Sequence, residues 1–316
     1  MPVPKTFTLN NGIEFPTVGL GTYRSKPGEV EEAVKTAIDA GYRHFDCAWF
    51  YGNEHEIGQA IHSKICSGVI KRKDVFIGSK LWNNFHARSA VVPKLKESLE
   101  AFRLDYLDLY LVHWPMGFKE DAPLAPKENV QEAFSDVDYL ETWQGMEDAY
   151  KLGLVKSIGL SNFNAEQVDR ICKNCTITPT INQVECNPNI NQKKLIKFCR
   201  ERGVLLMGFC PLGRSEYSGR PGFPEPTIYD PKVQEIGKKY NKTGAQVVLN
   251  YEVNNLGIFV IPKSVTPSRI KENIDIFDFE LNDEEVAYLD SCDKNKRVCP
   301  ANDWKDHKYF SFNAEF

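Results

Sequence analysis

The alternation of short apolar runs with longer amphipathic stretches constrains the fold of this chain most strongly. Buried parallel strands form continuous apolar runs, whereas helices repeat their apolar residues about every 3.6 positions. Eight apolar runs alternate with amphipathic stretches, and this pattern predicts a closed (β/α)₈ barrel of the TIM type. The expected strands are residues 18–21, 44–46, 75–80, 107–113, 157–161, 180–185, 204–209 and 258–261, and the expected helices include 29–40, 90–102, 139–152, 165–172, 192–202, 231–240 and 244–254.

An open, doubly wound sheet is the alternative for such an alternation. Its dinucleotide fingerprint requires a further glycine and a helix start after Gly-x-Gly, and Gly19-Leu20-Gly21 lacks both. We therefore favour the barrel, as one domain over residues 1–316. Residues 6–17 predict a β-hairpin, because Asn11-Gly12 accepts the positive φ of a tight turn, and this hairpin would cap the barrel.

Composition excludes several classes of protein. The chain has 316 residues, 42% of them hydrophobic and 26% charged, with a formal net charge of −4. Such a balance gives no electrostatic footprint for nucleic acid. The start of the chain has no apolar core of signal-peptide length, and no window approaches the roughly 20 apolar residues of a membrane span. We expect a cytoplasmic protein without nucleic-acid or membrane partners.

The nine cysteines are scattered along the chain, which suits reduced thiols better than a disulfide framework. Cys172 and Cys175 are the one closely spaced pair. No second pair follows at the spacing of a zinc site, so we predict no metal site.

Three connecting segments are longer than usual, namely residues 114–137, 211–229 and the tail 291–316. All three follow or overhang the carboxyl ends of expected strands, where barrels carry their functional sites. Segments of this length are uncommon unless they are functional or disordered. We interpret them as walls of a pocket, with plain surface excursions as the alternative.

Polar residues recur where the apolar runs end. Because the carboxyl ends of barrel strands share one mouth, these side chains should converge there. The residues are Asp46, Lys80, His113, Ser161, Asn162, Gln183 and, just after the last run, Lys263.

Tyr51 follows Asp46 by five positions and offers a phenol to the same mouth. A carbonyl that accepts a hydride gains charge on its oxygen, so a proton donor must lie within about 3 Å of it. We assign that role to Tyr51, with Lys80 lowering the pKa of the phenol. Asp46 would hold Lys80, and His113 would orient the carbonyl oxygen.

Three segments together resemble the aldo-keto reductases, in the branch of the aldose and aldehyde reductases. They are residues 41–58, residues 146–163 ending in Ile-Gly-Leu-Ser-Asn-Phe, and residues 261–269. The resemblance implies a barrel fold, NADPH/NADP⁺ as cofactor, and a catalytic tetrad of Asp46, Tyr51, Lys80 and His113.

The resemblance also implies a cofactor site across the mouth. Lys263, Ser264, Thr266 and Arg269 would hold the 2′-phosphate, where Thr266-Pro267 opens a helix whose N-terminus attracts anions. Ser161, Asn162 and Gln183 would bind the nicotinamide carboxamide, and Glu272 and Asn273 the adenine. The remaining implied contacts are Gly21, Thr22, Tyr23, Asp46, Phe209, Pro211, Leu212, Ser215 and Val265.

The sequence departs from the family pattern in two places around the cofactor. Phe209 stands where a tyrosine commonly stacks on the nicotinamide, so the stacking remains but the hydroxyl is lost. Arg214 replaces a serine after Pro-Leu-Gly, with Ser215 and Glu216 following. The pyrophosphate contacts are therefore less closely matched than the phosphate end.

The implied substrate walls are aromatic, which favours apolar or aromatic carbonyls. Tyr23 occupies a position that is usually tryptophan, and Cys299 is either a packing thiol or a site of oxidative modulation. The tail diverges from the aldose reductase pattern beyond Cys299. The wall residues are Tyr23, Phe50, Trp82, His113, Trp114, Cys299 and Trp304, with Phe310 as a further tail contributor.

The sequence thus predicts a monomeric, NADPH-dependent reductase of small-molecule carbonyl compounds, acting on aldehydes and, as a second class, ketones. A ketosteroid or hydroxysteroid reductase of the same family stays open, as does a family member that binds cofactor without turnover. A metal-dependent hydrolase is disfavoured, because the six histidines include no His-x-His pair at a strand end.

Overall fold

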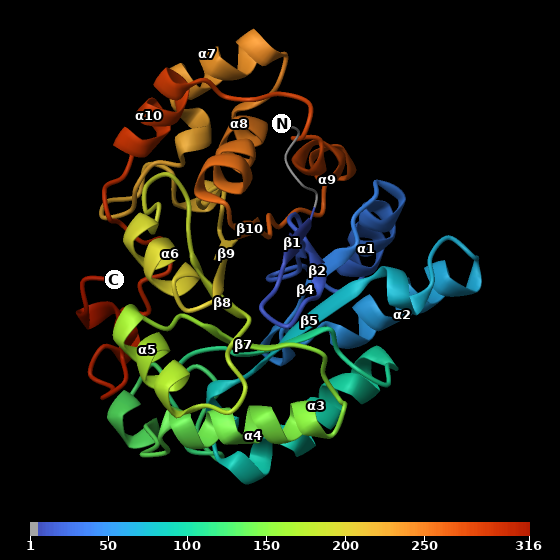
Figure 1. Ribbon diagram of the computed structural model, residues 1–316, viewed down its shortest axis with the longest axis vertical. Helices are drawn as coiled ribbons and strands as arrows, with labels where there is room; N and C mark the ends of the chain where they lie inside the picture. Colours follow the sequence, from blue (N-terminus) through green and yellow to red (C-terminus); the bar gives the residue numbers. More distant parts are fainter. Residues whose placement is uncertain (1–5) are drawn as a thin grey trace.

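The computed structural model describes residues 6–316, and a sheet of eight parallel strands forms its centre (Figure 1). Parallel bridges from Val18 to Val260 and from Gly21 to Lys263 join the two edge strands and close the sheet into a barrel. The predicted (β/α)₈ barrel is confirmed, and the doubly wound alternative is wrong. In sheet order the strands are β10 (Phe259–Val260), β9 (Leu205–Phe209), β8 (Ile181–Glu185), β7 (Ile158–Ser161), β6 (Leu109–Val112), β5 (Phe76–Leu81), β4 (His44–Asp46) and β3 (Leu20–Gly21).

The parallel register brings the polar strand ends to one level. Asp46 lies opposite Gly78, Lys80 opposite Leu111, and Ser161 opposite Gln183. Four of these residues are buried although they are polar or charged, namely Asp46, Lys80, Ser161 and Gln183. The register therefore builds the mouth that the sequence predicts from strand ends.

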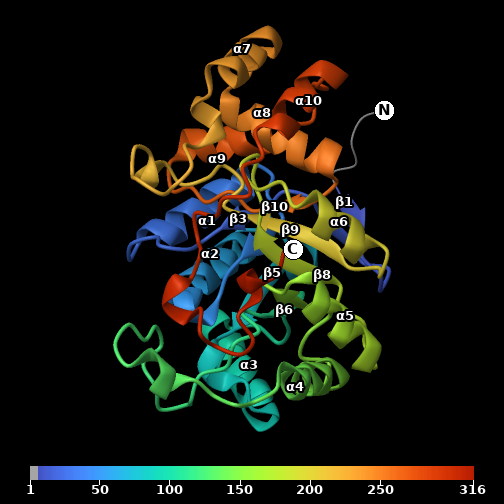
Figure 2. The same ribbon diagram turned by 90° about the vertical axis from the view of Figure 1, so that its left-hand side faces the viewer.

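Helices surround the barrel (Figures 1 and 2). Several begin at a capping box, as at Asn164, Thr243 and Asn282, where the side chain accepts from the backbone three residues on. The helices are α1 (Glu29–Asp39), α2 (Glu54–Cys66), α3 (Arg88–Phe102), α4 (Tyr139–Lys151), α5 (Ala165–Asn174), α6 (Lys193–Arg200), α7 (Pro231–Tyr240), α8 (Gly244–Tyr251), α9 (Pro267–Ile274) and α10 (Asp283–Ser291).

Three features of the helical layer differ from the sequence prediction. Helices α2 and α10 were not among the expected helices, and α2 begins directly after the Tyr51 motif with a polar Glu-His-Glu. Helix α8 does not continue as an α-helix but passes into a π-helix (Glu252–Leu256) that ends at Gly257, where φ is 67°.

The predicted N-terminal hairpin is present as β1 (Thr6–Thr8) and β2 (Glu14–Pro16), which pair antiparallel. The ring of Phe15 is fully buried and packs against His44, Phe76 and Phe259 of the barrel strands. The hairpin thus closes the amino-terminal end of the barrel, opposite the mouth. Residues 1–5, the start of the expected domain, lie outside the described residues.

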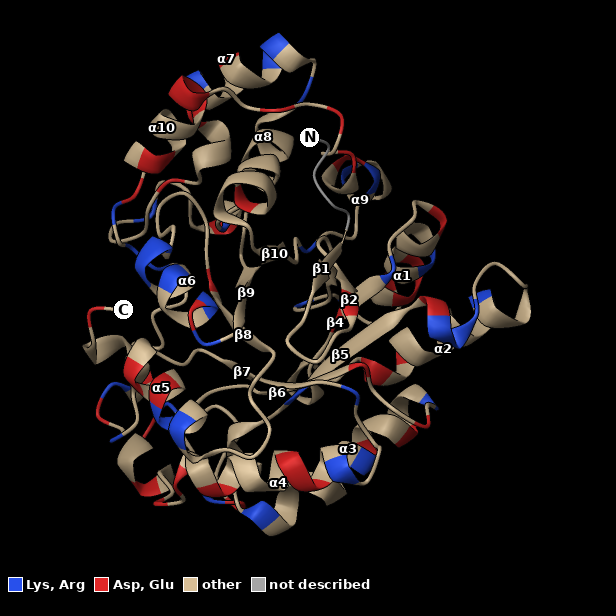
Figure 3. Cartoon of the chain, viewed as in Figure 1, with Lys and Arg blue, Asp and Glu red and all other residues tan. Residues whose placement is uncertain are grey.

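Lysine, arginine, aspartate and glutamate are interspersed over the outer helices (Figure 3). Neither sign forms a continuous stripe in that view, which agrees with the small net charge of −4. Between residues 6 and 316, no helix is long and apolar enough to cross a membrane.

The three long segments pack over the mouth. In the first, Phe118 bridges Phe134, and the indole of Trp82 donates to the carbonyl of Leu124 over 2.8 Å. The tail crosses the same region, since the indole of Trp304 donates to the carbonyl of Pro126 over 3.3 Å. Short helical turns at Ser215–Tyr217, Thr227–Tyr229, Asn302–Trp304 and Ser311–Asn313 order the other two segments.

Candidate active site

A buried ion pair lies at the centre of the barrel mouth. The Lys80 ammonium, on a residue with no exposed surface, is 2.7 Å from Oδ2 of Asp46 and 2.7 Å from the carbonyl oxygen of Cys47. Oδ1 of Asp46 accepts from the amide of Gln183 at 2.7 Å. Strands β4, β5 and β8 therefore fix this pair from three directions.

Tyr51 is presented by a short 3₁₀ turn, Trp49–Tyr51, which ends at Gly52 with a φ of 69°. Its hydroxyl oxygen lies 3.4 Å from Nζ of Lys80. Only residues without a Cβ adopt such a φ freely, so Gly52 allows the chain to turn directly behind the phenol. The structure thus brings Asp46, Tyr51 and Lys80 together, as the sequence predicts.

The expected lowering of the Tyr51 pKa is wrong for this structure. Burial and the negative charge of Asp46 raise the pKa of the phenol well above 10.0. The Lys80 ammonium is balanced by Asp46 at closer range, so it does not offset the loss of hydration around Tyr51. Tyr51 is therefore a neutral phenol that keeps its proton near pH 7.

His113 follows β6, and its ring lies beside that of Tyr51, with 5.9 Å between the ring centroids. Burial and the charge of Lys80 lower the pKa of His113 well below 6.5, so the imidazole is neutral. Nδ1 of His113 is buried and has no hydrogen-bond partner. A neutral imidazole has one N–H to donate, so it is suited to orient a carbonyl oxygen.

Ser161 ends strand β7, and Asn162 follows it beside His113. The Asn162 amide donates to the carbonyl oxygen of His113 at 2.9 Å and to Oγ of Ser161 at 3.2 Å. Its Oδ1 is buried without a partner, and its backbone φ is 62°. An unsatisfied buried acceptor is costly, so Asn162 is suited to receive an N–H donor from a ligand.

The predicted phosphate site lies where β10 leads into α9. Lys263 and Arg269 are exposed there, and no ion pair engages either side chain in the described part of the chain. Thr266 is the N-cap residue with Pro267 at N1, as predicted, but its side chain makes no capping bond. Its backbone N–H donates to Oγ of Ser264 instead, at 3.1 Å. Two cations and a helix N-terminus without a side-chain cap are the groups that attract anions in proteins.

Other predicted cofactor contacts lie where the barrel closes and on α9. A Cβ on Gly21 would lie 2.7 Å from the carbonyl oxygen of Ile261, so only glycine fits where the barrel closes. Thr22 donates from Oγ1 to the carbonyl oxygen of Asp46 at 2.9 Å. Asn273 is buried on α9, and Glu272 accepts from the hydroxyl of Thr243.

The segment after β9 reaches across the mouth. Arg214 pairs with Glu216 at 2.8 Å, and Glu216 lies 3.9 Å from Arg24, which follows β3. Ser215 is exposed and accepts from the hydroxyl of Tyr229 at 2.9 Å. Glu216 thus makes an ionic contact between two mouth loops, which the sequence did not predict, and Arg214 pairs with the same carboxylate from within its own loop.

Aromatic side chains wall the mouth beyond Tyr51. Phe50 stacks on Trp82 with 3.7 Å between centroids, and the Trp304 ring lies 5.7 Å from that of Trp114. Tyr23 is 39% exposed with its ring 4.9 Å from that of Tyr51, so it stands at the entrance. Phe310 joins the same cluster, together with Met116 and Phe312, which the sequence analysis missed.

A buried carboxylate that the sequence analysis also missed fixes the start of the tail. Glu185, at the end of β8, accepts from the backbone N–H groups of Val298 at 2.6 Å and Cys299 at 2.8 Å. Arg297 adds its charge nearby and lies over the ring of Phe312 at 3.9 Å. The position of Glu185 directly after a strand run was the available signal. Cys299 contacts this loop junction rather than the aromatic cluster.

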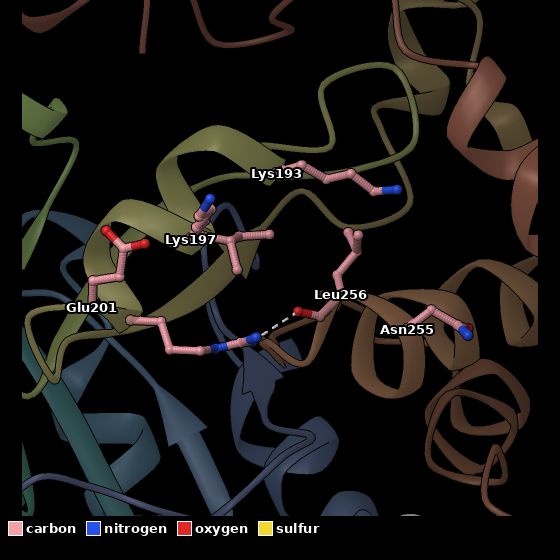
Figure 4. A pocket seen from close by; sticks show the side chains of 7 residues that line it. Lys193, Lys197, Glu201, Asn255 and Leu256 are labelled. Atoms are coloured by element: carbon pink, nitrogen blue, oxygen red, sulfur yellow. Dashed lines mark hydrogen bonds between the residues drawn. The ribbon is translucent and has the colours of Figure 1, made fainter.

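A cavity of about 420 Å³ lies away from this site, between α6 and the π-helix (Figure 4). Lys193, Lys197 and Glu201 extend from α6 on one side, and Leu256 and Asn255 lie on the other. The groups of the barrel mouth take no part in its lining. Among residues 6–316, no three His, Cys, Asp or Glu side chains gather as metal ligands.

Comparison with known proteins identifies the family. The model of the aldo/keto reductase family matches residues 17–294, which is most of the chain. The crystal structure of the Bombyx mori aldo-keto reductase AKR2E4 in complex with NADP superimposes with a TM-score of 0.90 at 43% identity, covering 98% of this chain and 99% of that one. The chain belongs to the aldo-keto reductase family.

Two further relatives show which members of the family the chain resembles. The aldose reductase of Schistosoma japonicum has a structure with a TM-score of 0.92 at 39% identity, covering 99% of this chain and 100% of that one. Estradiol 17 beta-dehydrogenase 5 of Mus musculus is 41% identical over an alignment of 319 positions, which covers 99% of this chain and 98% of that protein.

Proposed function

We propose that this protein reduces carbonyl compounds to alcohols with NADPH, taking aldehydes and, as a second class, ketones. One observation carries the proposal: a neutral phenol, Tyr51, lies 3.4 Å from a buried ammonium that is itself paired with Asp46. Membership of the aldo-keto reductase family supports an oxidoreductase that uses NADP. The roles of individual residues are our assignment.

The residues present fit NADP(H). The unpartnered Oδ1 of Asn162 matches the N–H groups of a carboxamide beside His113. The exposed Lys263 and Arg269 at the start of α9 match the charge of a 2′-phosphate. When bound, the reduced nicotinamide supplies the hydride.

The protein's own groups handle the proton and the carbonyl oxygen. His113 donates a hydrogen bond that orients the oxygen toward Tyr51, and Tyr51 transfers its phenolic proton to that oxygen as charge develops there. Lys80 then stabilises the phenolate that Tyr51 becomes, because its ammonium already lies 3.4 Å from the hydroxyl. Asp46 keeps Lys80 in place throughout.

The raised pKa of Tyr51 supports this assignment. A phenol with a raised pKa stays protonated across the physiological range. Its proton is transferred only as the substrate oxygen gains negative charge and therefore becomes more basic. Such an arrangement favours the transition state over the ground state.

The walls favour an apolar carbonyl compound. Trp82, Trp114 and Trp304 surround the approach to Tyr51, so the faces around the reacting group are aromatic. A ketosteroid or hydroxysteroid is the second candidate. It is supported by the likeness to estradiol 17 beta-dehydrogenase 5 and by Tyr23 at the entrance, which is smaller than the tryptophan usual at this position. Monomeric state and cytoplasmic location stay predictions from the sequence.

Replacing Tyr51 with phenylalanine tests the proposal. NADPH oxidation should fall by roughly 100-fold or more with an aromatic aldehyde, because the general acid is lost. NADPH affinity, measured by quenching of intrinsic fluorescence, should stay within about twofold. Tyr106→Phe is the matched control, because the Tyr106 ring packs against Arg72 and Lys156 away from the mouth. Near-normal aldehyde reduction by Tyr51→Phe would show that Tyr51 is not the proton donor.

A silent wild type distinguishes the remaining alternative. If the protein binds NADPH but oxidises none across a panel of aldehydes, ketones and steroids, it is a cofactor-binding member of the family without turnover. Activity with 3-keto or 17-keto steroids above that with aldehydes would favour the steroid candidate.

A further inference from the structure

A buried carboxyl group that the proposed mechanism does not use lies close to Tyr51 in the chain. Glu54 is the first residue of α2, three positions after Tyr51, and only 4% of it is exposed. Its Oε1 accepts a hydrogen bond from the hydroxyl of Ser79 at 2.5 Å. Glutamate is almost never fully buried unless it is paired, so the partner of Glu54 indicates what the residue does.

The hydrogen bond to Ser79 acts on the strand that carries Lys80. Ser79 and Lys80 are consecutive residues of β5, so their side chains point to opposite faces of the strand. Lys80 reaches Asp46 in the barrel mouth, whereas Ser79 reaches Glu54 on α2. Glu54 therefore holds β5 from its outer face at the position where Lys80 acts on the inner face.

The segment between Tyr51 and α2 is also fixed on other sides. The amide of Asn53 donates to the carbonyl oxygen of Thr22 at 3.0 Å, which ties this segment to the loop after β3. Ile57 and Ile61 lie on one face of α2 and are fully buried in the core. Helix α2 is thus a fixed support, and Glu54 links its first turn to β5.

The protonation of Glu54 depends on its surroundings. Burial raises the pKa of Glu54 from 4.5 to about 7, although the hydrogen bond from Ser79 lowers it. The Glu97 carboxylate on α3 raises this pKa, and the Lys80 ammonium lowers it. At pH 6 the carboxyl group is therefore mostly protonated, and its carbonyl oxygen still accepts from a hydroxyl. The contact with Ser79 does not require a buried negative charge.

We propose that Glu54 is a positioning residue for the proton transfer. Through its hydrogen bond to Ser79 it holds the Tyr51 turn against β5 and so sets the distance between the Tyr51 hydroxyl and the Lys80 ammonium. That distance is 3.4 Å. The attraction between the ammonium and a developing phenolate falls as the distance grows, and a misplacement of about 1 Å costs about 100-fold in rate. The effect on turnover rests on the proposed function, whereas the effect on the distance does not.

Crystal structures of the variants test the positioning without any assay of turnover. In Glu54→Leu the Ser79 hydroxyl loses its acceptor, so we expect the Tyr51 hydroxyl to lie about 0.5 Å or more farther from Nζ of Lys80 than in wild type. Glu54→Gln keeps an acceptor oxygen and should keep the wild-type distance. An unchanged distance in Glu54→Leu would overturn the proposal.

Reduction of an aromatic aldehyde at pH 6 gives the second readout, because glutamine then replaces a mostly neutral carboxyl group. The kcat of Glu54→Leu should fall about 10-fold, with KM for the aldehyde and Kd for NADPH within about twofold of wild type. Glu54→Gln should keep kcat within about twofold. Equal losses in both variants would show that the hydrogen bond is not what matters. Glu56→Leu is the matched control and should behave like wild type, because Glu56 joins α2 to the N–H of Gly28 instead.

Ser79→Ala removes the donor of the same hydrogen bond, and it takes the place of Glu54→Leu in both experiments if that variant does not fold. The double variant Glu54→Leu/Ser79→Ala should be no slower than the slower single variant, because each change removes one shared contact. Losses in kcat that multiply would contradict the proposed path through Ser79. If wild type turns over no carbonyl compound, the crystal structures still decide the positioning, and only the proposed function fails.

Discussion

Breaking the buried Lys80–Asp46 pair should destabilise the protein more than removing it as a unit. Lys80 and Asp46 are 0% and 4% exposed, and their charges are 2.7 Å apart. Asp46→Asn leaves a buried ammonium facing two neutral acceptors, and Lys80→Met leaves a buried carboxylate whose contact is the Gln183 amide. Loss of one partner of such a pair costs about 3–5 kcal/mol.

The corresponding change in melting temperature follows from chain length. An unfolding entropy of about 2.1 cal/mol/K per residue gives roughly 660 cal/mol/K for 316 residues. A loss of about 4 kcal/mol therefore lowers Tm by about 6 °C. The double variant Asp46→Asn/Lys80→Met carries no unpaired charge, so it should recover most of this loss.

Differential scanning calorimetry of wild type, both single variants and the double variant measures this coupling. If the decreases in Tm of the two single variants add, so that the double variant loses about 12 °C, the pair does not act as a unit. All three variants should lose turnover by about 100-fold or more, because each disturbs the Tyr51 environment. Recovery of stability without recovery of activity would separate the structural role of the pair from its chemical one.

The remaining predictions concern a buried histidine, the phosphate site and the tail. Burial and the charge of Lys80 lower the pKa of His44 from 6.5 to about 3, so its contribution to stability is present above pH 6.5 and is lost as the pH falls toward 3. Between pH 7 and 5 this loss is about 2 kcal/mol in urea unfolding, and His44→Leu should remove it while the exposed His55→Gln should not; identical pH dependence in all three would contradict it. Lys263→Met with Arg269→Met should weaken NADPH binding by about 10-fold or more and leave NADH binding nearly unchanged, and equal losses for both cofactors would place the 2′-phosphate elsewhere. Glu185→Gln should raise KM for the carbonyl substrate by about threefold and speed proteolysis in the tail, and an unaltered cleavage rate would show that Glu185 does not hold the tail.

The barrel and the central groups of the site could be predicted from the sequence because they depend on patterns among residues that are close together in the chain. A polar residue directly after an apolar run must lie at the strand end, and this rule placed Asp46, Lys80 and His113 at one mouth. The rule also covers Glu185, but its function depends on the tail, which folds back from more than a hundred residues away. No local pattern reports such a contact.

The direction of the Tyr51 pKa shift could not be predicted from the sequence either. The sign of the Tyr51 pKa shift depends on how completely water is excluded and on whether Lys80 is neutralised by a closer partner. Both are properties of packing rather than of residue type. Likewise, helix α2 was missed because its first turn, Glu54 onward, is polar and partly turned into the barrel, where Glu54 is buried against Ser79.

The tail is fastened at both ends, and this has a consequence for engineering. Glu185 holds it at Val298 and Cys299, and the carbonyl oxygen of Phe316 accepts from the N–H of Ala165 at 3.1 Å. A segment fixed in this way is thermodynamically a closed loop, so its ordering entropy is set by its two anchors. A tail transplanted from a relative should therefore keep its new specificity only if the partners of both contacts are transplanted with it.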